Sequence, residues 1–239
     1  MGRMSIIEKL GEKRKVDIKV FEFEGIKYVI RYPNCYVEGE KYPTILHLHG
    51  AGTRGDNIDD VLGGAFFRFT DDKEDFPFVT VAPQCNANSW FDIFEKLIKL
   101  AKNIVTESFC DPERYYLIGL SMGGYAAWQL GMSCPELFAA MIPICGGGMA
   151  WNAARLKSVP VWAFHGALDP TVSPEETRLM VNGVNQCGGR ARFTLYPDAY
   201  HDAWSPTYCN PEVFDWLLSN KKKTAAKHSD GFNDSERFG

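Results

Sequence analysis

The sequence YYLIGLSMGGYAAWQL, residues 115–130, decides the fold, because its pattern changes abruptly from that of a strand to that of a helix. A β-rich apolar run ends at Gly119, and a helical pattern begins at Met122. Ser121 stands at the corner, inside a Gly-x-Ser-x-Gly motif that Gly123 completes. In a sharp strand-to-helix turn of this kind the serine oxygen is lifted clear of the backbone. The motif also arises by chance around a serine that only caps a helix, but the flanking strand and Ala-rich helix favour the turn.

Short apolar runs alternate with helical patterns along most of the chain. This alternation implies an α/β fold with a central, mostly parallel sheet and helices on both faces. Strands are expected in residues 17–33, 42–50, 76–84, 115–119, 138–147, 159–166 and 190–197, and helices in residues 91–105, 122–132, 173–189 and 210–220. The first range turns at Glu24 and Gly25, which predicts an N-terminal antiparallel hairpin. Residues 51–64 are expected to form a glycine-rich, acidic loop.

Length and composition are those of one folded soluble domain. The 239 residues include 45% hydrophobic and 23% charged residues, and no polar linker divides them. We therefore expect a single domain over residues 1–220 and a polar, poorly ordered tail over residues 221–239. The net charge of −4 gives no reason to expect a nucleic-acid partner, because phosphate binding needs a basic surface.

Expectations about cellular location, metals and cofactors rest mainly on sequence patterns that are missing. No run approaches the roughly 20 apolar residues of a membrane-spanning helix, and residues 1–20 lack the apolar core of a signal peptide. Cytoplasmic residence is the default expectation, with secretion left open for a processed chain. The 7 cysteines form neither a complete disulfide set nor a C-x-x-C pattern, so no metal or other cofactor is expected. The sequence does not indicate an oligomeric state.

A serine hydroxyl needs a base within hydrogen-bond reach, and that base must be oriented by a carboxylate. Around a strand-turn-helix serine the chain order is serine, then acid, then histidine. Two histidines, His201 and His228, follow Ser121 with an acidic candidate at a strand end between the serine and the histidine. His228 lies in the polar tail, whereas His201 follows the last expected strand, in YPDAYHDAW. The sequence therefore predicts His201 as the base, with a surface-loop histidine as the alternative.

The predicted acid is Asp169, in the stretch VWAFHGALDP. It follows a buried strand by a few residues, so its carboxylate is expected at the edge of the sheet that the serine occupies. Asp198 and Asp202 are too near His201 in sequence to approach its ring easily from the required side. The alternative role for Asp169 is turn formation or N-capping. His165, four residues earlier, is interpreted as a packed or hydrogen-bonded histidine.

Acyl transfer also needs two N–H donors for the oxyanion. One is expected from Met122, directly after the serine, and the other from Ala51, in the loop after an early strand. The glycines of this loop could instead suggest a phosphate cradle, but no G-x-x-x-x-G-K-[ST] motif is present and no helical pattern opens directly behind it. His47 and His49 lack a third metal ligand. We interpret His47 as structural and His49 as ordering the loop.

Three tryptophans are candidates for a substrate pocket: Trp90, Trp151 and Trp204. All lie near loops expected at the carboxyl edge of the sheet, where an aromatic acyl group or a sugar could stack on them. Packing of these side chains in the core is an equally good interpretation.

Four segments carry a resemblance to a known family. They are LHLHGAGTRGDN, GLSMGGYAAW, HGALDPTVSPEET and YHDAWSPTYCNPEVFDWLL, and they span roughly residues 40–220 in the family's order. The chain resembles the α/β-hydrolase superfamily, within it the small esterases related to dienelactone hydrolase, the phospholipase/carboxylesterase group and the prolyl-oligopeptidase-like "predicted peptidases". It departs from true dienelactone hydrolases, whose nucleophile is cysteine, because serine occupies the turn.

The resemblance implies a three-layer α/β-hydrolase fold without a large lid. It further implies Ser121 as nucleophile, Asp169 and His201 as its partners, and Ala51 and Met122 as oxyanion donors. The expected function is a serine hydrolase that cleaves carboxylic esters of small or aromatic acyl groups, with feruloyl or acetyl esters of carbohydrate among the candidate substrates. A thioesterase or acyltransferase with the same triad, and a non-catalytic small-molecule binder of this fold, remain as alternatives.

Overall fold

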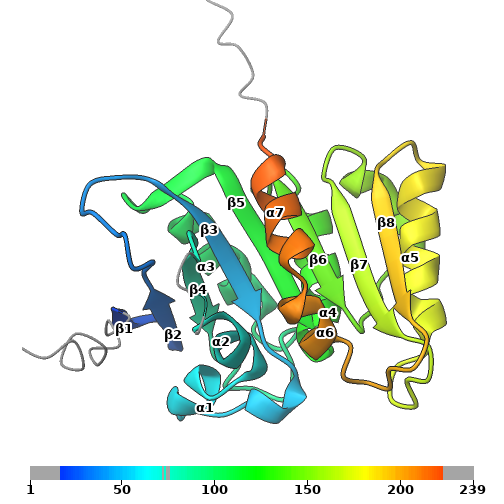
Figure 1. Cartoon of the computed structure of the whole chain (residues 1–239), viewed down its shortest axis with the longest axis horizontal. Coiled ribbons are helices and arrows are strands. Elements are labelled where there is room, and N and C mark those ends of the chain that lie inside the picture. Colours follow the sequence, from blue (N-terminus) through cyan, green and yellow to red (C-terminus); the bar gives the residue numbers. More distant parts are fainter. Residues whose placement is uncertain (1–16, 72, 74–75, 223–239) are drawn as a thin grey trace, which may run out of the picture.

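An eight-stranded sheet forms the centre of the protein in the computed structural model, which describes residues 17–71, 73 and 76–222 (Figure 1). The strand order is β1-β2-β4-β3-β5-β6-β7-β8. The strands are β1 Ile18–Phe23, β2 Ile26–Arg31, β3 Tyr42–Leu48, β4 Val79–Pro83, β5 Cys110–Leu120, β6 Ala140–Ile144, β7 Val161–Gly166 and β8 Ala191–Tyr196. The pairs β1–β2 and β2–β4 are antiparallel, and the other five are parallel. The predicted mostly parallel sheet with an N-terminal antiparallel hairpin is confirmed.

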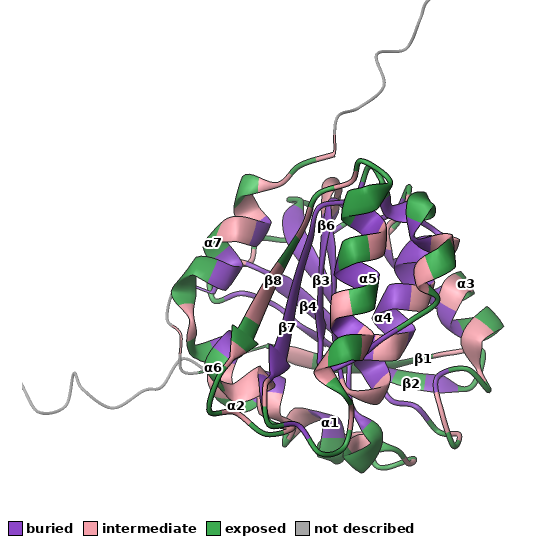
Figure 2. Ribbon diagram, turned by 90° about the vertical axis from the view of Figure 1, so that its right-hand side faces the viewer, coloured by how far each residue is buried: buried purple, intermediate pink, exposed green. Residues whose placement is uncertain are grey.

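Helices cover both faces of this sheet. The α-helices are α1 Asp59–Leu62, α2 Ala65–Thr70, α3 Phe94–Ile104, α4 Met122–Ser133, α5 Pro174–Gln186, α6 Trp204–Cys209 and α7 Pro211–Ser219, and the 3-10 helices are η2 Ala51–Thr53 and η3 Ala150–Leu156. Figure 2 shows the sheet nearly edge-on, with α3, α4 and α5 on one face and α2, α6 and α7 on the other. The three layers expected from the sequence are therefore present.

Strand β5 shows why the sequence of a central strand is a continuous apolar run. Tyr115 and Leu117 are buried in the core cluster shared with α3, α4 and α5, whereas Tyr116 and Ile118 are buried in the cluster shared with α2, α6 and α7. Successive side chains of a strand point to opposite faces, so burial of both faces requires apolar residues at every position. The same burial makes β5 a rigid support for the turn that follows it.

The observed β5 begins five residues earlier than expected. Cys110 pairs with Tyr42, and the register then shifts so that Tyr115 pairs with Thr44. The polar segment between them bends around Asp111, whose carboxylate accepts hydrogen bonds from the Glu113 N–H and the Arg114 side chain. An irregular, polar start of this kind has no alternating pattern, so the sequence located only the apolar end of the strand.

The segment between β3 and β4 contains more helix than expected. The acidic loop predicted for residues 51–64 holds η2 and α1, and α2 follows it directly. The expectation of a loop without helices over residues 51–64 is therefore corrected. These helices have 3, 4 and 6 residues, and so few residues cannot establish a 3.6-residue hydrophobic period. Helix α6, which was not predicted either, also has only 6 residues.

The two helices predicted over residues 173–189 and 210–220 are confirmed, and each has a capped first turn. The Ser173 hydroxyl accepts a hydrogen bond from the N–H of Glu175, and α5 begins with proline. The Asn210 side chain accepts one from the N–H of Glu212, and α7 also begins with proline. Proline suits the first helical position because its missing N–H would have no partner there.

The predicted C-terminal tail lies largely outside the described residues, because residues 223–239 are not described. At its start, the Lys222 ammonium group donates to the carbonyl oxygens of Glu136 and Leu137, each at 3.0 Å. The first residues assigned to the tail thus lie against the body of the protein. Among the described residues, no helix has the length and apolar composition that crossing a bilayer requires.

Candidate active site

Ser121 occupies a strained corner between β5 and α4. Its backbone has φ 53° and ψ −119°, in a region that residues other than glycine rarely adopt. Strain of this kind costs about 1–3 kcal/mol and persists only where the surroundings hold it. Here the Ser121 N–H donates to the carbonyl of Ile144 at 2.8 Å, and the Ser121 carbonyl accepts from the N–H of Tyr125 at 3.1 Å. Hydrogen bonds on both sides therefore fix the corner on which the hydroxyl stands.

The glycines around Ser121 are required by close backbone contacts. A Cβ on Gly119 would overlap the carbonyl oxygen of Gly123, and a Cβ on Gly123 would overlap the carbonyl oxygen of Leu48. A Cβ on Gly124 would lie 2.5 Å from the carbonyl oxygen of Ile144. The turn is thus packed against both neighbouring strands, as the motif predicted, and a larger residue at any of these positions would displace it.

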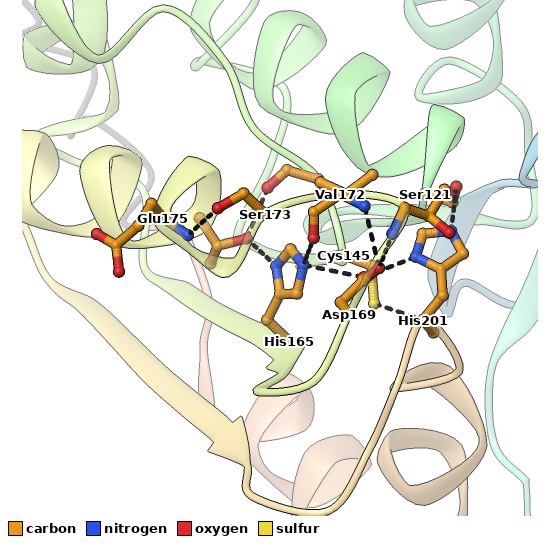
Figure 3. A network of polar contacts seen from close by, with 11 residues as sticks. Ser121, Cys145, His165, Asp169, Val172, Ser173, Glu175 and His201 are labelled. Carbon is orange, nitrogen blue, oxygen red and sulfur yellow. Dashed lines mark hydrogen bonds and ion pairs between the residues drawn. The ribbon is translucent and has the colours of Figure 1, made fainter.

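The three residues predicted as a triad lie in one hydrogen-bonded row (Figure 3). The Ser121 Oγ is 2.9 Å from His201 Nε2, and His201 Nδ1 is 2.7 Å from Asp169 Oδ2. Asp169 follows β7 and His201 follows β8, so each side chain stands beyond the carboxyl end of a parallel strand. Because the carboxylate can only accept, Nδ1 donates to it and Nε2 is left to accept the serine proton. The competing Asp202 instead accepts the N–H and hydroxyl of Ser205 at the start of α6.

The Asp169 carboxylate is buried, with 8% of the residue exposed, and it accepts four hydrogen bonds. Oδ1 accepts the N–H groups of Thr171 at 2.8 Å and Val172 at 3.0 Å. Oδ2 accepts from His201 and, at 3.1 Å, lies close to Nε2 of a second histidine, His165. Burial alone would raise the pKa of Asp169, but the hydrogen bonds outweigh it and hold the pKa below its usual value. The carboxylate is therefore ionised near pH 7.

His165, interpreted from the sequence as a packed or hydrogen-bonded histidine, is a second partner of the acid. Its Nε2 lies 3.1 Å from Asp169 Oδ2 and 3.0 Å from the carbonyl oxygen of Val172, and both of these atoms only accept. Nε2 must therefore carry a proton, while Nδ1 lies 2.8 Å from the Thr177 hydroxyl. Burial lowers the pKa of His165, so the ring is neutral near pH 7. The sequence signal for this contact was a histidine four residues before the acid, in HGALDP. Only the structure of the turn shows that the two side chains touch.

His49 orients the backbone next to the serine. Its Nε2 accepts the N–H of Cys85 at 2.9 Å, so its Nδ1 carries the proton and donates to the Gly50 carbonyl at 2.7 Å. In a planar trans peptide the carbonyl and the following N–H point in opposite directions, so the Ala51 N–H is held away from His49. A Cβ on Gly50 would lie 3.4 Å from the Ser121 Cβ, which places this peptide beside the serine. The loop-ordering interpretation of His49 agrees with these contacts.

Both predicted N–H donors begin helical segments. Met122 is the first residue of α4 and Ala51 is the first residue of η2. The first N–H groups of a helix have no acceptor within it. Each of these residues therefore has an N–H group with no acceptor inside its own helical segment.

His47 and His49 are buried side chains whose charged forms the fold disfavours. Burial, with a smaller contribution from His49, lowers the pKa of His47 to about 3. Burial and the nearby Arg54 lower the pKa of His49 to about 4, although its hydrogen bond to Gly50 acts in the opposite direction. Both rings are therefore neutral in the folded protein near pH 7.

We expect the free energy of unfolding to decrease as the pH falls from about 6.5 to about 4.5. In this window the unfolded chain binds protons on His47 and His49 that the folded protein cannot bind, so the full stability is present only above pH 6.5. Each group contributes a loss of about 1.4 kcal/mol per pH unit. Urea unfolding at several pH values measures this slope, and His47→Phe should reduce it by about 1.4 kcal/mol per pH unit. A stability that is flat over this window would contradict the prediction.

A cavity of about 720 Å³ opens beside Ser121 and His201. Its lining comes from the end of β3, from η2, from α1 and α2, and from the start of α6. Its lining residues are His47, His49, Gly50, Ala51, Gly52, Thr53, Asp59, Asp60, Val61, Gly63, Gly64, Ala65, Phe66, Arg68, Leu120, Ser121, Thr171, His201 and Trp204. The cavity thus brings the serine and Ala51 together with apolar side chains such as Phe66 and Leu120 in one lining.

Of the three candidate pocket tryptophans, only Trp204 lines this cavity. Its ring stands edge-on to that of His201, with centroids 5.3 Å apart. Trp90 is fully buried in the core, where its Nε1 donates to the His49 carbonyl at 3.0 Å. Trp151 lies in η3 with 81% of its surface exposed, outside the cavity lining. All three tryptophans lie near the sheet edge in the sequence. This position alone could not distinguish a side chain that lines the cavity from one buried in the core or one exposed on the surface.

One group of side chains has the composition of a metal site. Atoms of Cys145, His165 and Asp169 that could ligate an ion lie within 4.8 Å of one another. However, the Cys145 thiol donates to the His201 carbonyl at 3.1 Å, and burial raises its pKa to about 12. His165 Nε2 carries a proton, as argued above. A metal would need the thiolate and a free imidazole nitrogen, so these residues do not fit one.

The fold and the row of serine, histidine and aspartate define an α/β-hydrolase. The chain belongs to the dienelactone hydrolase family, because the model of that family matches residues 60–228. A comparison with curated proteins gave no match.

Solved structures with this fold include several esterases. A protein described as a thermostable esterase is 32% identical, with a TM-score of 0.73, and the alignment covers 87% of this chain and 63% of that one. This chain thus spans less than two thirds of the esterase's length. A ferulic acid esterase is 16% identical with a TM-score of 0.65, covering 86% of this chain and 98% of that one. Est1E from Butyrivibrio proteoclasticus is 15% identical with a TM-score of 0.62, covering 84% and 98% respectively. At these identities the last two are similar in fold alone.

Proposed function

We propose that this protein is a serine hydrolase that cleaves carboxylic esters through an acyl-enzyme. The observation that carries the proposal is the continuous row from the Ser121 hydroxyl through His201 to the buried Asp169 carboxylate, beside an open cavity. Membership of the dienelactone hydrolase family and the similarity to a thermostable esterase support hydrolysis as the reaction class. The substrate in this proposal is a small-molecule ester, and no cofactor takes part.

In the proposed reaction, Ser121 Oγ attacks the ester carbonyl while His201 Nε2 takes the hydroxyl proton. Asp169 holds the ring so that Nε2 faces the serine, and it stabilises the imidazolium that forms. His201 then protonates the leaving alcohol, and the acyl group stays on Ser121. Water, activated by the same ring, attacks this acyl-enzyme and releases the acid.

The negative charge of the tetrahedral intermediate is assigned to the N–H groups of Ala51 and Met122. Donors fixed before the reaction stabilise this charge without reorganising, and removal of one such donor typically costs about 3–4 kcal/mol. The contact of His49 with the Gly50 carbonyl supports the assignment of Ala51, because it sets the direction of the adjacent N–H. Met122 follows the serine directly, which is the usual position of the other donor in this turn.

The cavity supports small or aromatic acyl groups as substrates. Its volume of about 720 Å³ and the presence of Phe66, Leu120 and Trp204 in its lining favour an apolar group larger than acetyl. Feruloyl esters of carbohydrate remain within this class, and acetyl esters would fill only the entrance. The name of the ferulic acid esterase of similar fold is consistent with an aromatic acyl group.

The proposal is tested by measuring wild-type turnover of p-nitrophenyl acetate, p-nitrophenyl hexanoate, methyl ferulate and a hexanoyl thioester. We expect hydrolysis of the oxygen esters, with a higher kcat/KM for the larger acyl groups. Product analysis with added alcohols separates hydrolysis from acyl transfer. Preferential cleavage of the thioester would favour a thioesterase, and transfer to alcohol in place of water would favour an acyltransferase. No turnover by the folded protein would contradict the proposal and favour a binding protein.

A further inference from the structure

His47 is a polar side chain in the lining of the cavity. Only 4% of the residue is exposed, yet it belongs to the lining, next to the ring of Phe66 at a centroid distance of 4.3 Å. One hydrogen bond joins its Nε2 to the hydroxyl of Tyr208 at 3.1 Å. Among the described residues no hydrogen bond joins Nδ1 to another group, and Nδ1 is not one of the fully buried polar atoms left unpaired. A ring nitrogen of a cavity-lining residue without a protein partner is available to a bound molecule.

The register of the sheet places His47 away from the point of chemistry. His47 on β3 pairs with Ile118 on β5, three residues before Ser121. Three residues of extended chain span about 10 Å. Because one cavity is lined by both side chains, a group of this length attached to Ser121 could bring its far end to His47.

The chemistry of the ring limits what it can bind. Burial keeps His47 neutral near pH 7, so Nδ1 offers either one N–H or one lone pair. The role of Nδ1 is the opposite of the role that Nε2 takes toward the Tyr208 hydroxyl. A hydroxyl group can donate or accept, so it matches either tautomer, whereas a hydrocarbon matches neither.

The charges around the cavity disfavour an anionic ligand. Asp59, Asp60 and Arg68 belong to the lining, which gives one net negative charge among these three. Val61, Phe66, Leu120 and Trp204 supply apolar surface between the charged residues and the serine. A neutral, apolar body with one hydroxyl at its far end therefore fits this lining better than a carboxylate or an alkyl chain.

We propose that the cavity holds the acyl group of the ester and that His47 binds a neutral hydroxyl at the far end of that group. This inference rests on the proposed ester hydrolysis, and it makes His47 a specificity-determining residue. The structural role expected for His47 from the sequence explains the hydrogen bond between Nε2 and Tyr208. It gives no function to the other ring nitrogen, Nδ1.

The test compares two esters of one shape, the p-nitrophenyl esters of β-(p-hydroxyphenyl)propionic acid and β-(p-methylphenyl)propionic acid. The measured quantity is the ratio of their kcat/KM values, so that general effects on the catalytic groups cancel. We expect wild type to prefer the hydroxyl ester about tenfold and His47→Phe to bring the ratio close to one, because phenylalanine keeps the ring and removes the nitrogens. Arg68→Met, at another lining position, should keep the wild-type ratio. Thermal unfolding checks that both variants are folded.

The outcomes separate this inference from the proposed function. Equal kcat/KM values in wild type, or a ratio lost in Arg68→Met and kept in His47→Phe, would overturn the role of His47 while ester hydrolysis stands. Hydrolysis of p-nitrophenyl acetate with neither propionate ester cleaved would overturn the acyl assignment of the cavity. Absence of turnover with every ester would overturn the proposed function itself. If His47→Phe does not fold, His47→Gln, which keeps a polar group of smaller size, should retain part of the preference.

Discussion

Ser121→Ala is expected to abolish ester hydrolysis, lowering kcat by about a millionfold, while the protein remains folded. The substitution removes one oxygen atom and leaves the Cβ in the same place, so the packed turn around Gly119 and Gly123 is unchanged. Without the oxygen no acyl-enzyme forms, and the oxyanion donors can assist only a direct attack by water. Steady-state hydrolysis of p-nitrophenyl hexanoate measures the loss, and the absence of a burst of p-nitrophenol shows that no acyl-enzyme accumulates.

Ser205→Ala is the matched control for this change. Ser205 lies in α6, adjacent to the cavity residue Trp204, and its hydroxyl donates to Asp202 at 2.7 Å, away from the triad. We expect its kcat to stay within about twofold of wild type, because surface substitutions away from the site have small effects. Retention of full activity in Ser121→Ala would show that the nucleophile is misassigned.

Asp169→Asn is expected to lower kcat by about ten-thousandfold. All four hydrogen-bond positions of the carboxylate face donors, two of them backbone N–H groups that cannot change. The amide oxygen must therefore face Thr171 and Val172, which directs the NH2 group toward the two histidines. His201 then presents a lone pair at Nδ1 and a proton at Nε2, so it cannot accept the proton of Ser121.

The same substitution is expected to destabilise the protein by about 1–3 kcal/mol, because His165 Nε2 and the new NH2 group would both be donors facing each other in a buried site. Urea unfolding measures this loss alongside the kinetics. Asp202→Asn is the control, since it changes the acid next to His201 in sequence and keeps an oxygen that can cap α6. Near-normal activity of Asp169→Asn with a large loss in Asp202→Asn would reverse the assignment of the acid.

The residues that meet at the site were predictable because their chemistry imposes an order along the chain. A strand-turn-helix serine demands an acid and then a histidine at later strand ends, and few candidates satisfy that demand. Packing at the turn was predictable for a similar reason, since Gly119 and Gly123 stand where a Cβ has no room. These inferences depend on local sequence and chain order, which a single sequence contains.

Features that depend on contacts between distant segments were not predictable. The second histidine on Asp169 is fixed by the turn after β7, and the place of Trp90 beneath the loop is fixed by its bond to His49. The order of the strands in the sheet also arises from long-range pairing that no local pattern encodes. Helices α1, α2 and α6 are too short for a period to appear, although all three contribute residues to the cavity lining.

The position of α1 and α2 separates two parts of the molecule that can change independently. Both helices lie in the single crossover between β3 and β4, whereas Ser121, Asp169 and His201 follow β5, β7 and β8 (Figure 1). Residues 58–70 therefore supply a wall of the cavity without holding any member of the serine row. Insertion, deletion or recombination within this one segment can give descendants of the fold new ligand preferences while the remaining framework is inherited intact.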